Sequence, residues 1–110
     1  MFVIDKRNKI ILTKGDSATI FIQVVDIVGN EYKIKPTDTI KMTVRKTVGD
    51  DVAIYKVATP EHYIIIDPED TSELNTGLFL YDIELTTEEG FVYTIIPTNY
   101  FQLTEEISHG

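Results

Sequence analysis

The chain of 110 residues has no cysteine and no tryptophan, and it has no lysine or arginine after Lys56. The lack of cysteine excludes a disulfide framework, a thiolate-ligated metal and thiol catalysis. Residues 1–56 carry ten basic and seven acidic side chains (+3), whereas residues 57–110 carry eleven acidic and no basic ones (−11), which gives the net charge of −8. This acidic balance disfavours binding to nucleic acid or to an anionic membrane, because both need a clustered basic face.

Long apolar runs and glycine-rich loops are also missing. No apolar stretch approaches the roughly 20 residues that a membrane-spanning helix needs, and the apolar start of the chain is interrupted at Asp5-Lys6-Arg7, unlike a secretory signal. The six glycines are single and spaced like turns, so none forms a phosphate-binding loop. We therefore expect one domain, residues 1–110, made in the cytoplasm without a signal peptide.

The apolar residues that are present are mainly branched at Cβ. Sixteen Ile, nine Val and fourteen Thr compare with only nine Ala plus Leu. Branched side chains lose rotamer freedom on a helix but pack well on a pleated surface. The composition therefore predicts an all-β domain.

The hydrophobic pattern places strands along the whole chain. Residues 39–47 and 78–86 alternate cleanly, with apolar side chains on one face and polar ones on much of the other, whereas residues 17–26 are apolar on both faces, which predicts a central or partner-covered strand. Further strands are expected at 9–13, 31–34, 52–58, 63–66, 91–96 and, after Pro97, 100–107. About seven to nine short strands separated by turns every 8 to 12 residues are typical of a β-sandwich or a β-barrel.

One segment carries a helix-start signal. Asp67 suits the N-cap position, Pro68 suits the first helical position, and the acidic residues that follow interact favourably with the helix dipole. We expect one short helical turn near residues 68–74.

Catalysis has few candidate residues. The histidines are His62 and His109, and the serines are Ser17, Ser72 and Ser108. A Ser-His-Asp arrangement would need His62, because His109 lies beside the end of the chain. The ordinary interpretation of His62 is a solvated loop residue after Pro60, and we prefer it.

The carboxylates have alternatives of their own. Asp82 and Glu84 lie two residues apart on one strand face, about 6.5 to 7 Å by strand rise, a separation that overlaps the range of glycoside hydrolases. We favour a solvent face on which they are cross-strand partners of Lys41 and Arg45. The acidic run from Asp67 to Glu73 offers oxygen ligands to calcium, but it lacks the EF-hand spacing, and helix capping already explains it. The eleven Phe and Tyr residues divide, in proportions the sequence does not fix, between the core and a surface that binds protein or sugar.

The chain as a whole resembles a known group of proteins. The resemblance rests on turns, caps and core alternation, namely Ile11–Ala18 with its Gly-Asp turn, Asp67–Thr71, Leu74, Gly77, Tyr81–Leu85, Gly90, Tyr93–Pro97, Phe101, Leu103 and Glu105–Ser108. These residues resemble small tail or baseplate-associated proteins of phages and prophages of Gram-positive bacteria. They are also similar to the N-terminal domain of upper baseplate proteins, which implies an immunoglobulin-like β-sandwich used for assembly in the virion tail. No catalytic, cofactor or metal-ligating residue is implied.

The functional expectation is a non-enzymatic structural protein that assembles with other tail or baseplate proteins or with copies of itself. The alternative is a small carbohydrate- or calcium-binding β-sandwich module, because sandwiches host both functions. The sequence does not identify the partner-binding residues. It predicts one acidic end of the molecule, suited to a basic partner surface or to head-to-tail stacking on the Lys-bearing end of another copy. This end is formed by Glu69, Asp70, Glu73, Glu88, Glu89, Glu105 and Glu106.

Overall fold

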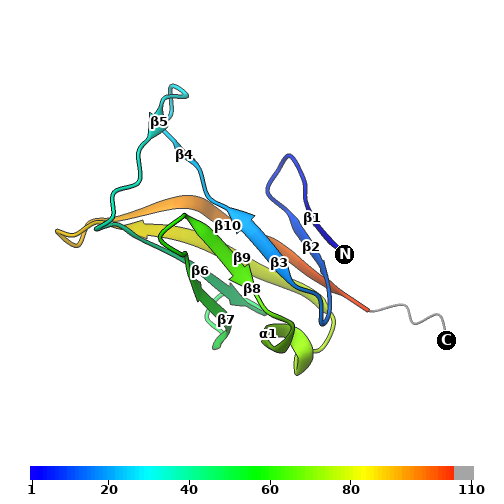
Figure 1. Ribbon diagram of the computed structural model, residues 1–110. Coiled ribbons are helices and arrows are strands. Elements are labelled where there is room, and N and C mark those ends of the chain that lie inside the picture. The colour runs from blue at the N-terminus through cyan, green and yellow to red at the C-terminus, as the bar shows by residue number, and fades with distance from the viewer. Residues whose placement is uncertain (106–110) are drawn as a thin grey trace.

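The computed structural model describes residues 1–105, which form strands and one short helix (Figure 1). The elements in chain order are β1 (Phe2–Ile4), β2 (Ile10–Thr13), β3 (Ala18–Phe21), β4 (Val24–Val25), β5 (Glu31–Tyr32), β6 (Thr39–Arg45), β7 (Val52–Val57), β8 (Tyr63–Ile66), α1 (Pro68–Ser72), β9 (Gly77–Thr86) and β10 (Val92–Thr104). The helix is too short and too polar to cross a membrane, and no other helix occurs in this part of the chain.

Six strands form the main sheet in the order β1-β2-β10-β9-β6-β7. Neighbours are antiparallel except β2 and β10, which run parallel over Phe101–Thr104. Strands from the basic half of the chain therefore lie beside strands from the acidic half. This interleaving places Lys41 directly opposite Glu84, as expected, whereas Arg45 lies opposite Leu80 and donates through Nε to the carbonyl of Asp50 at 3.2 Å.

A second, smaller layer covers one face of the main sheet. It consists of β3 and β8, which pair antiparallel with Ile20 opposite Ile64. Their inward side chains and those of the main sheet form one core in which Leu12, Met42, Ile64 and Ile66 are fully buried. The all-β, sandwich-like fold that the sequence predicts is confirmed.

Alternation along the two longest regular strands is also confirmed. Ile40, Met42 and Val44 of β6 are buried. The alternate side chains of β9 are buried in the same way, and these are Phe79, Tyr81, Ile83 and Leu85. Each strand therefore has one face against the core, because successive side chains point to opposite sides.

The helix α1 begins where the sequence predicts. The carboxylate of Asp70 accepts the backbone N–H of Asp67 at 2.7 Å, and Pro68 occupies the first turn. Lys56 from β7 forms an ion pair with Asp70 at 2.7 Å and a longer one with Asp67 at 3.4 Å. The buried hydroxyl of Thr71 accepts the N–H of Gly15 at 2.9 Å, which attaches the helix to the turn between β2 and β3.

Three expectations differ from the structure. Residues 17–26 do not form one central strand, because the chain leaves the second layer after Phe21 and the outer side chain of Phe21 is exposed. Pro97 does not end a strand, because β10 continues through it. An additional strand, β1, precedes the first one predicted, and the end of the predicted strand at 100–107 lies partly outside the described residues.

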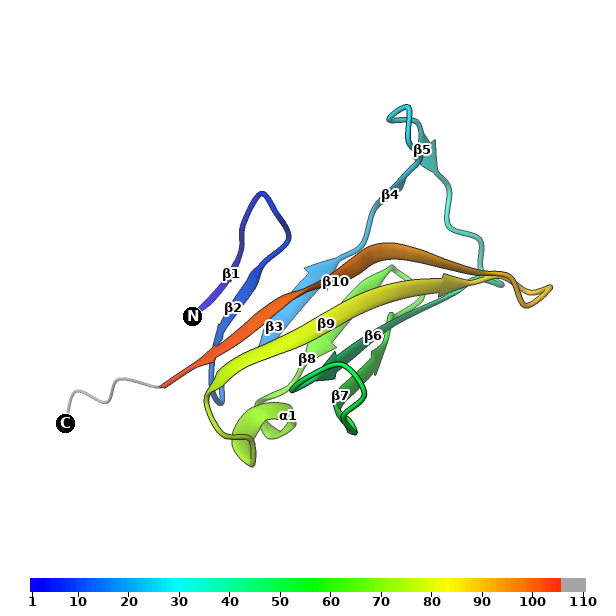
Figure 2. The ribbon, with the colours of Figure 1, turned by 180° about the vertical axis from the view of Figure 1, so that it is seen from behind.

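Proline is accommodated in β10 by irregular pairing with β9. Between Thr94 and Ile96, and again between Ile96 and Asn99, β10 advances one residue more than β9 does. Such bulges bend a strand and release the ladder hydrogen bond that proline lacks the donor to form. Figure 2 shows the resulting curvature of β10 toward its turn with β9.

The molecule has two contrasting ends (Figures 1 and 2). At the packed end, β3, β8 and α1 cover the main sheet. At the open end, the hairpin formed by β4 and β5, which we call the arm (residues 24–32), projects away from the sheet, and the β9–β10 turn extends in another direction.

Candidate partner-binding site

A groove of about 1040 Å³ lies at the open end, between the arm and the main sheet. Its floor is formed by side chains of β9 and β10, including Ile83, Leu85 and Ile96. The arm contributes Val24, Val25, Asp26, Ile27 and Tyr32. The lining is therefore largely apolar, which is the character of a binding surface rather than of a hydrated cleft.

Exposed apolar side chains gather around this groove. Six of the large apolar side chains that are exposed line it, namely Ile4, Phe21, Val25, Ile27, Phe91 and Tyr93. Val28 and Val92 are their neighbours in sequence and are also exposed. Scattered exposed apolar residues are normal, but a contiguous group of this kind marks an interaction surface.

The tip of the arm is the most exposed apolar point. Ile27 is 101% exposed and Val28 is 77% exposed. The carboxylate of Asp26 accepts the N–H groups of Val28 and Asn30 at 3.0 and 2.9 Å, which holds the turn in shape. The hydrogen bonds of the turn therefore hold two apolar side chains in solvent, where they contribute nothing to the core of their own chain.

The base of the arm is attached to the body by polar contacts. The hydroxyl of Tyr32 donates to Asp38 Oδ2 at 2.7 Å, and the same oxygen accepts the N–H of Lys35 at 2.9 Å. The hydrogen bond with Asp38 raises the pKa of Tyr32, with smaller contributions from burial and nearby charge. At the other side of the arm, the N–H of Ile22 donates to the carbonyl of His62 at 2.9 Å. These contacts fix where the arm leaves the body.

Four hairpin turns of the molecule share one backbone geometry. They span residues 5–9, 26–30, 59–63 and 87–91. In each, the first residue donates its N–H to the carbonyl of the fifth, and the fourth donates to the carbonyl of the first, with distances of 2.8 to 3.0 Å. The fourth residue always has a positive φ, between 65° and 92°, as three-residue hairpin loops with a bulge require.

The second and third residues of each turn, which we call its middle residues, differ in charge and polarity from one turn to the next. They are Lys6-Arg7, Ile27-Val28, Pro60-Glu61 and Glu88-Glu89. Asn8 of the basic turn and Glu89 of the acidic turn both line the groove. The carbonyl of Asn8 accepts a hydrogen bond from the Tyr81 hydroxyl, whereas the acidic turn lies beyond the end of β9 at Thr86. The turn that carries Lys6-Arg7 therefore lies beside one end of the groove, and the turn that carries Glu88-Glu89 lies beside the other. The charged side chains that line the groove itself are Asp26, Lys35 and Glu89.

The predicted single acidic end is wrong. Glu69, Asp70 and Glu73 belong to α1 and its C-cap, before β9 begins, and Glu88 and Glu89 follow after β9 ends. A strand of ten residues separates the two groups, and by strand rise this is roughly 30 Å. Glu105 hydrogen-bonds Thr76 at the packed end, and Glu106 lies outside the described residues.

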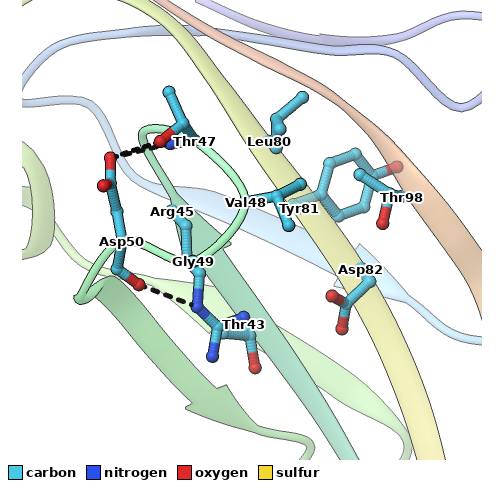
Figure 3. A pocket seen from close by; sticks show the side chains of 10 residues that line it. All are labelled: Thr43, Arg45, Thr47, Val48, Gly49, Asp50, Leu80, Tyr81, Asp82 and Thr98. Atoms are coloured by element: carbon cyan, nitrogen blue, oxygen red, sulfur yellow. Dashed lines mark hydrogen bonds between the residues drawn. The ribbon is translucent and has the colours of Figure 1, made fainter.

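A second, smaller cavity of about 370 Å³ lies on the outer face of the main sheet (Figure 3). The loop from Thr47 to Asp50 folds over β6 and β9 here, held by the Thr47 hydroxyl donating to Asp50 at 2.7 Å. Asp82 lines this cavity, but Glu84 does not. The two carboxylates therefore do not converge on one hollow.

His62 has a clear backbone role. It is the fourth residue of the turn at 59–63, where its φ of 70° allows the hairpin to close. Among residues 1–105, no hydrogen bond joins its imidazole to a serine or a carboxylate. Ser72 instead donates to the carbonyl of Glu69, and both Ser108 and His109 lie outside the described residues.

The acidic residues at α1 are engaged within the protein. Asp67 and Asp70 face Lys56, whose pKa is raised chiefly by its hydrogen bond to Asp70. Within residues 1–105, no group of three or more histidine, aspartate and glutamate side chains is arranged to hold a metal ion.

Sequence reasoning missed the groove, although one signal for it was present. An Ile-Val pair between Asp26 and Gly29 is unusual, because hairpin turns are normally polar. Comparison of the chain with family models, with curated proteins and with solved structures gave no match.

Proposed function

We propose that this protein is a non-enzymatic structural protein that acts through protein–protein contacts, as a component of a phage or prophage tail or baseplate. The observation that supports assembly is the exposed apolar surface at the open end, where the arm tip and the groove lie together. The phage assignment is supported by the sequence resemblance alone.

The described residues suit assembly better than chemistry. The polar groups that catalysis would use are dispersed, because His62 closes a turn, Asp70 pairs with Lys56, and Asp82 and Glu84 do not share a cavity. A large apolar surface on a small protein is instead typical of an interface with another protein.

The experiment that tests this function is analysis of particles. In a bacterium that encodes the protein, induction of the prophage followed by gradient purification of tails should yield particles in which mass spectrometry detects the chain in fixed stoichiometry. Deletion of its gene should give incomplete tails in electron micrographs, and re-expression should restore them. Purified tails without the chain, together with normal particles from the deletion strain, would contradict the assignment.

The carbohydrate- or calcium-binding alternative has a separate test. A thermal-shift series with calcium and with a glycan panel should leave the unfolding temperature unchanged if the function is assembly. A shift that saturates with one glycan, and that is lost when Tyr93 in the groove is replaced by alanine, would favour that alternative instead.

A further inference from the structure

The groove and the arm tip are complementary surfaces on the same chain. The groove is lined largely by apolar side chains, and the two apolar side chains of the tip, Ile27 and Val28, are 101% and 77% exposed. Ile27 borders the groove of its own chain without filling it, because the arm projects away from the body (Figure 1) and Ile27 is 101% exposed. A second copy would place an apolar tip in the groove and would cover the tip of the first copy with apolar side chains.

The charges at the two ends of the groove give the orientation of that second copy. Lys6-Arg7 belong to the turn whose Asn8 lines the groove, and Glu88-Glu89 belong to the turn whose Glu89 lines it at the other end. A two-fold axis through the middle of the groove would place the basic turn of each copy opposite the acidic turn of the other. A parallel arrangement would place like charges together, which is unfavourable.

Strand addition is a less suitable way to fill the groove. From Val92 to Tyr100, β10 pairs only with β9, so its other edge is open among the described residues. This part of β10 contains Pro97 and two bulges in its pairing with β9, and both features disfavour pairing with another strand. Packing of side chains, rather than a continuous sheet, fits the groove.

We propose that the protein forms a symmetric dimer in which each copy places the tip of its arm, Ile27-Val28, in the groove of the other, with Lys6-Arg7 facing the partner's Glu88-Glu89. Such an isologous arrangement uses the same surface on both copies and closes after two, so it does not build open filaments. The inference rests on the proposed function in that it names the partner at the assembly surface.

Sedimentation of the full chain at about 1 to 100 µM tests the dimer, since this range spans the affinities of ordinary transient interfaces. We expect a concentration-dependent dimer. The double variant Ile27→Asp with Val28→Asp should weaken the dimer by about tenfold or more, because it places charge in an apolar contact. Val48→Asp is the matched control, since Val48 is 81% exposed at a turn outside the groove, and it should leave the dimer unchanged.

Charge reversal tests the two-fold arrangement. Replacing Lys6 and Arg7 by glutamate, or Glu88 and Glu89 by lysine, should weaken the dimer in low salt. Combining all four substitutions should restore it, because the reversed charges again face each other across the axis. Circular dichroism should show that every variant keeps its fold, since these side chains are exposed.

The outcomes separate the dimer from the proposed function. A wild-type chain that stays monomeric throughout, a dimer that tolerates aspartate at the arm tip, or a fourfold variant that stays weak overturns the inference. A monomer that is nevertheless found in purified tails removes the dimer and leaves the proposed function standing. A dimer with the expected sensitivities that is absent from tails leaves the dimer and removes the phage function.

Discussion

The packed end and the open end of this molecule are built from strands of similar apolar character, yet the apolar side chains are buried at the packed end and exposed at the open end. At the packed end, Ile64 and Ile66 of β8 are fully buried against the main sheet. At the open end, Val25 and Ile27 of the arm remain exposed. The comparison shows that an apolar strand is buried only where it lies over the main sheet. The arm does not lie over the main sheet, so its apolar side chains stay exposed.

Hydrogen bonds at the base of the arm hold the arm away from the main sheet. The polar contacts of Tyr32 with Asp38 and of Ile22 with His62 fix the chain where it leaves the second layer. The apolar residues beyond that point are then held outside the core. A surface that is held in this way is available to a partner at a low cost in conformational entropy.

The largest effect is expected from a core truncation at the packed end. Ile64→Ala removes a fully buried side chain and should lower the free energy of unfolding by about 2–5 kcal/mol. Val25→Ala on the arm is the matched control and should change it by less than about 0.5 kcal/mol. Urea unfolding at a concentration where the chain is monomeric checks both. Equal losses would show that the arm belongs to the folded core.

An alkaline titration addresses Tyr81, which lies between the two ends. Burial, and to a smaller extent the charge of Asp5, raises the pKa of Tyr81 to about 12. The folded state therefore favours the neutral phenol, so stability is complete below the unfolded pKa of about 10 and is lost as the pH rises toward 12, by roughly 2–3 kcal/mol. Tyr81→Phe should show a smaller decline over this pH range than the wild-type protein. Parallel declines would contradict the assignment.

The same Tyr81→Phe variant also has an expected effect at neutral pH. It removes the hydrogen bond from the phenol to the carbonyl of Asn8, and it should reduce stability by about 0.5–1.5 kcal/mol. Amide hydrogen exchange should become faster mainly in β1 and β2, because this bond anchors their turn to the sheet. Exchange that increases equally in β6 and β7 would indicate a general loss of packing instead.

The smallest effect is expected from the turns. Gly29 and Gly90 have φ of 89° and 92°, and a Cβ at either would meet nothing within 4 Å, so alanine is resisted by backbone conformation alone. Each substitution to alanine should cost about 1 kcal/mol. Gly29→Ala should speed up amide hydrogen exchange within the arm and change the global free energy of unfolding little. Gly90→Ala should lower the global free energy of unfolding as well, because its turn joins the longer β9–β10 pair. Identical global losses would show that the arm unfolds with the rest of the molecule.

Several features could be predicted from the sequence because they depend on neighbours in the chain. The alternation in β6 and β9 follows from the two-residue period of a strand, and the capping of α1 depends on residues three positions apart. The continuity of β10 through Pro97 could not be predicted, because it depends on bulges opposite β9. The placement of the acidic residues was mispredicted for a similar reason, since it depends on the length of β9.

The candidate site could not be predicted from the sequence. Its components are visible in the sequence, namely the Ile27-Val28 tip and the four turns with their different middle residues. Their meeting around one groove requires the chain to leave the second layer after β3, β10 to bend and the β1–β2 turn to approach Tyr81.

The sequence by itself determined the all-β class, the core-facing residues of β6 and β9 and the start of the helix, because these follow from local backbone preferences and from the period of hydrophobicity. Only the tertiary structure decided which apolar residues stay exposed and which charges lie at opposite ends of the groove. These are properties of contacts between segments far apart in the chain, and no local pattern records them.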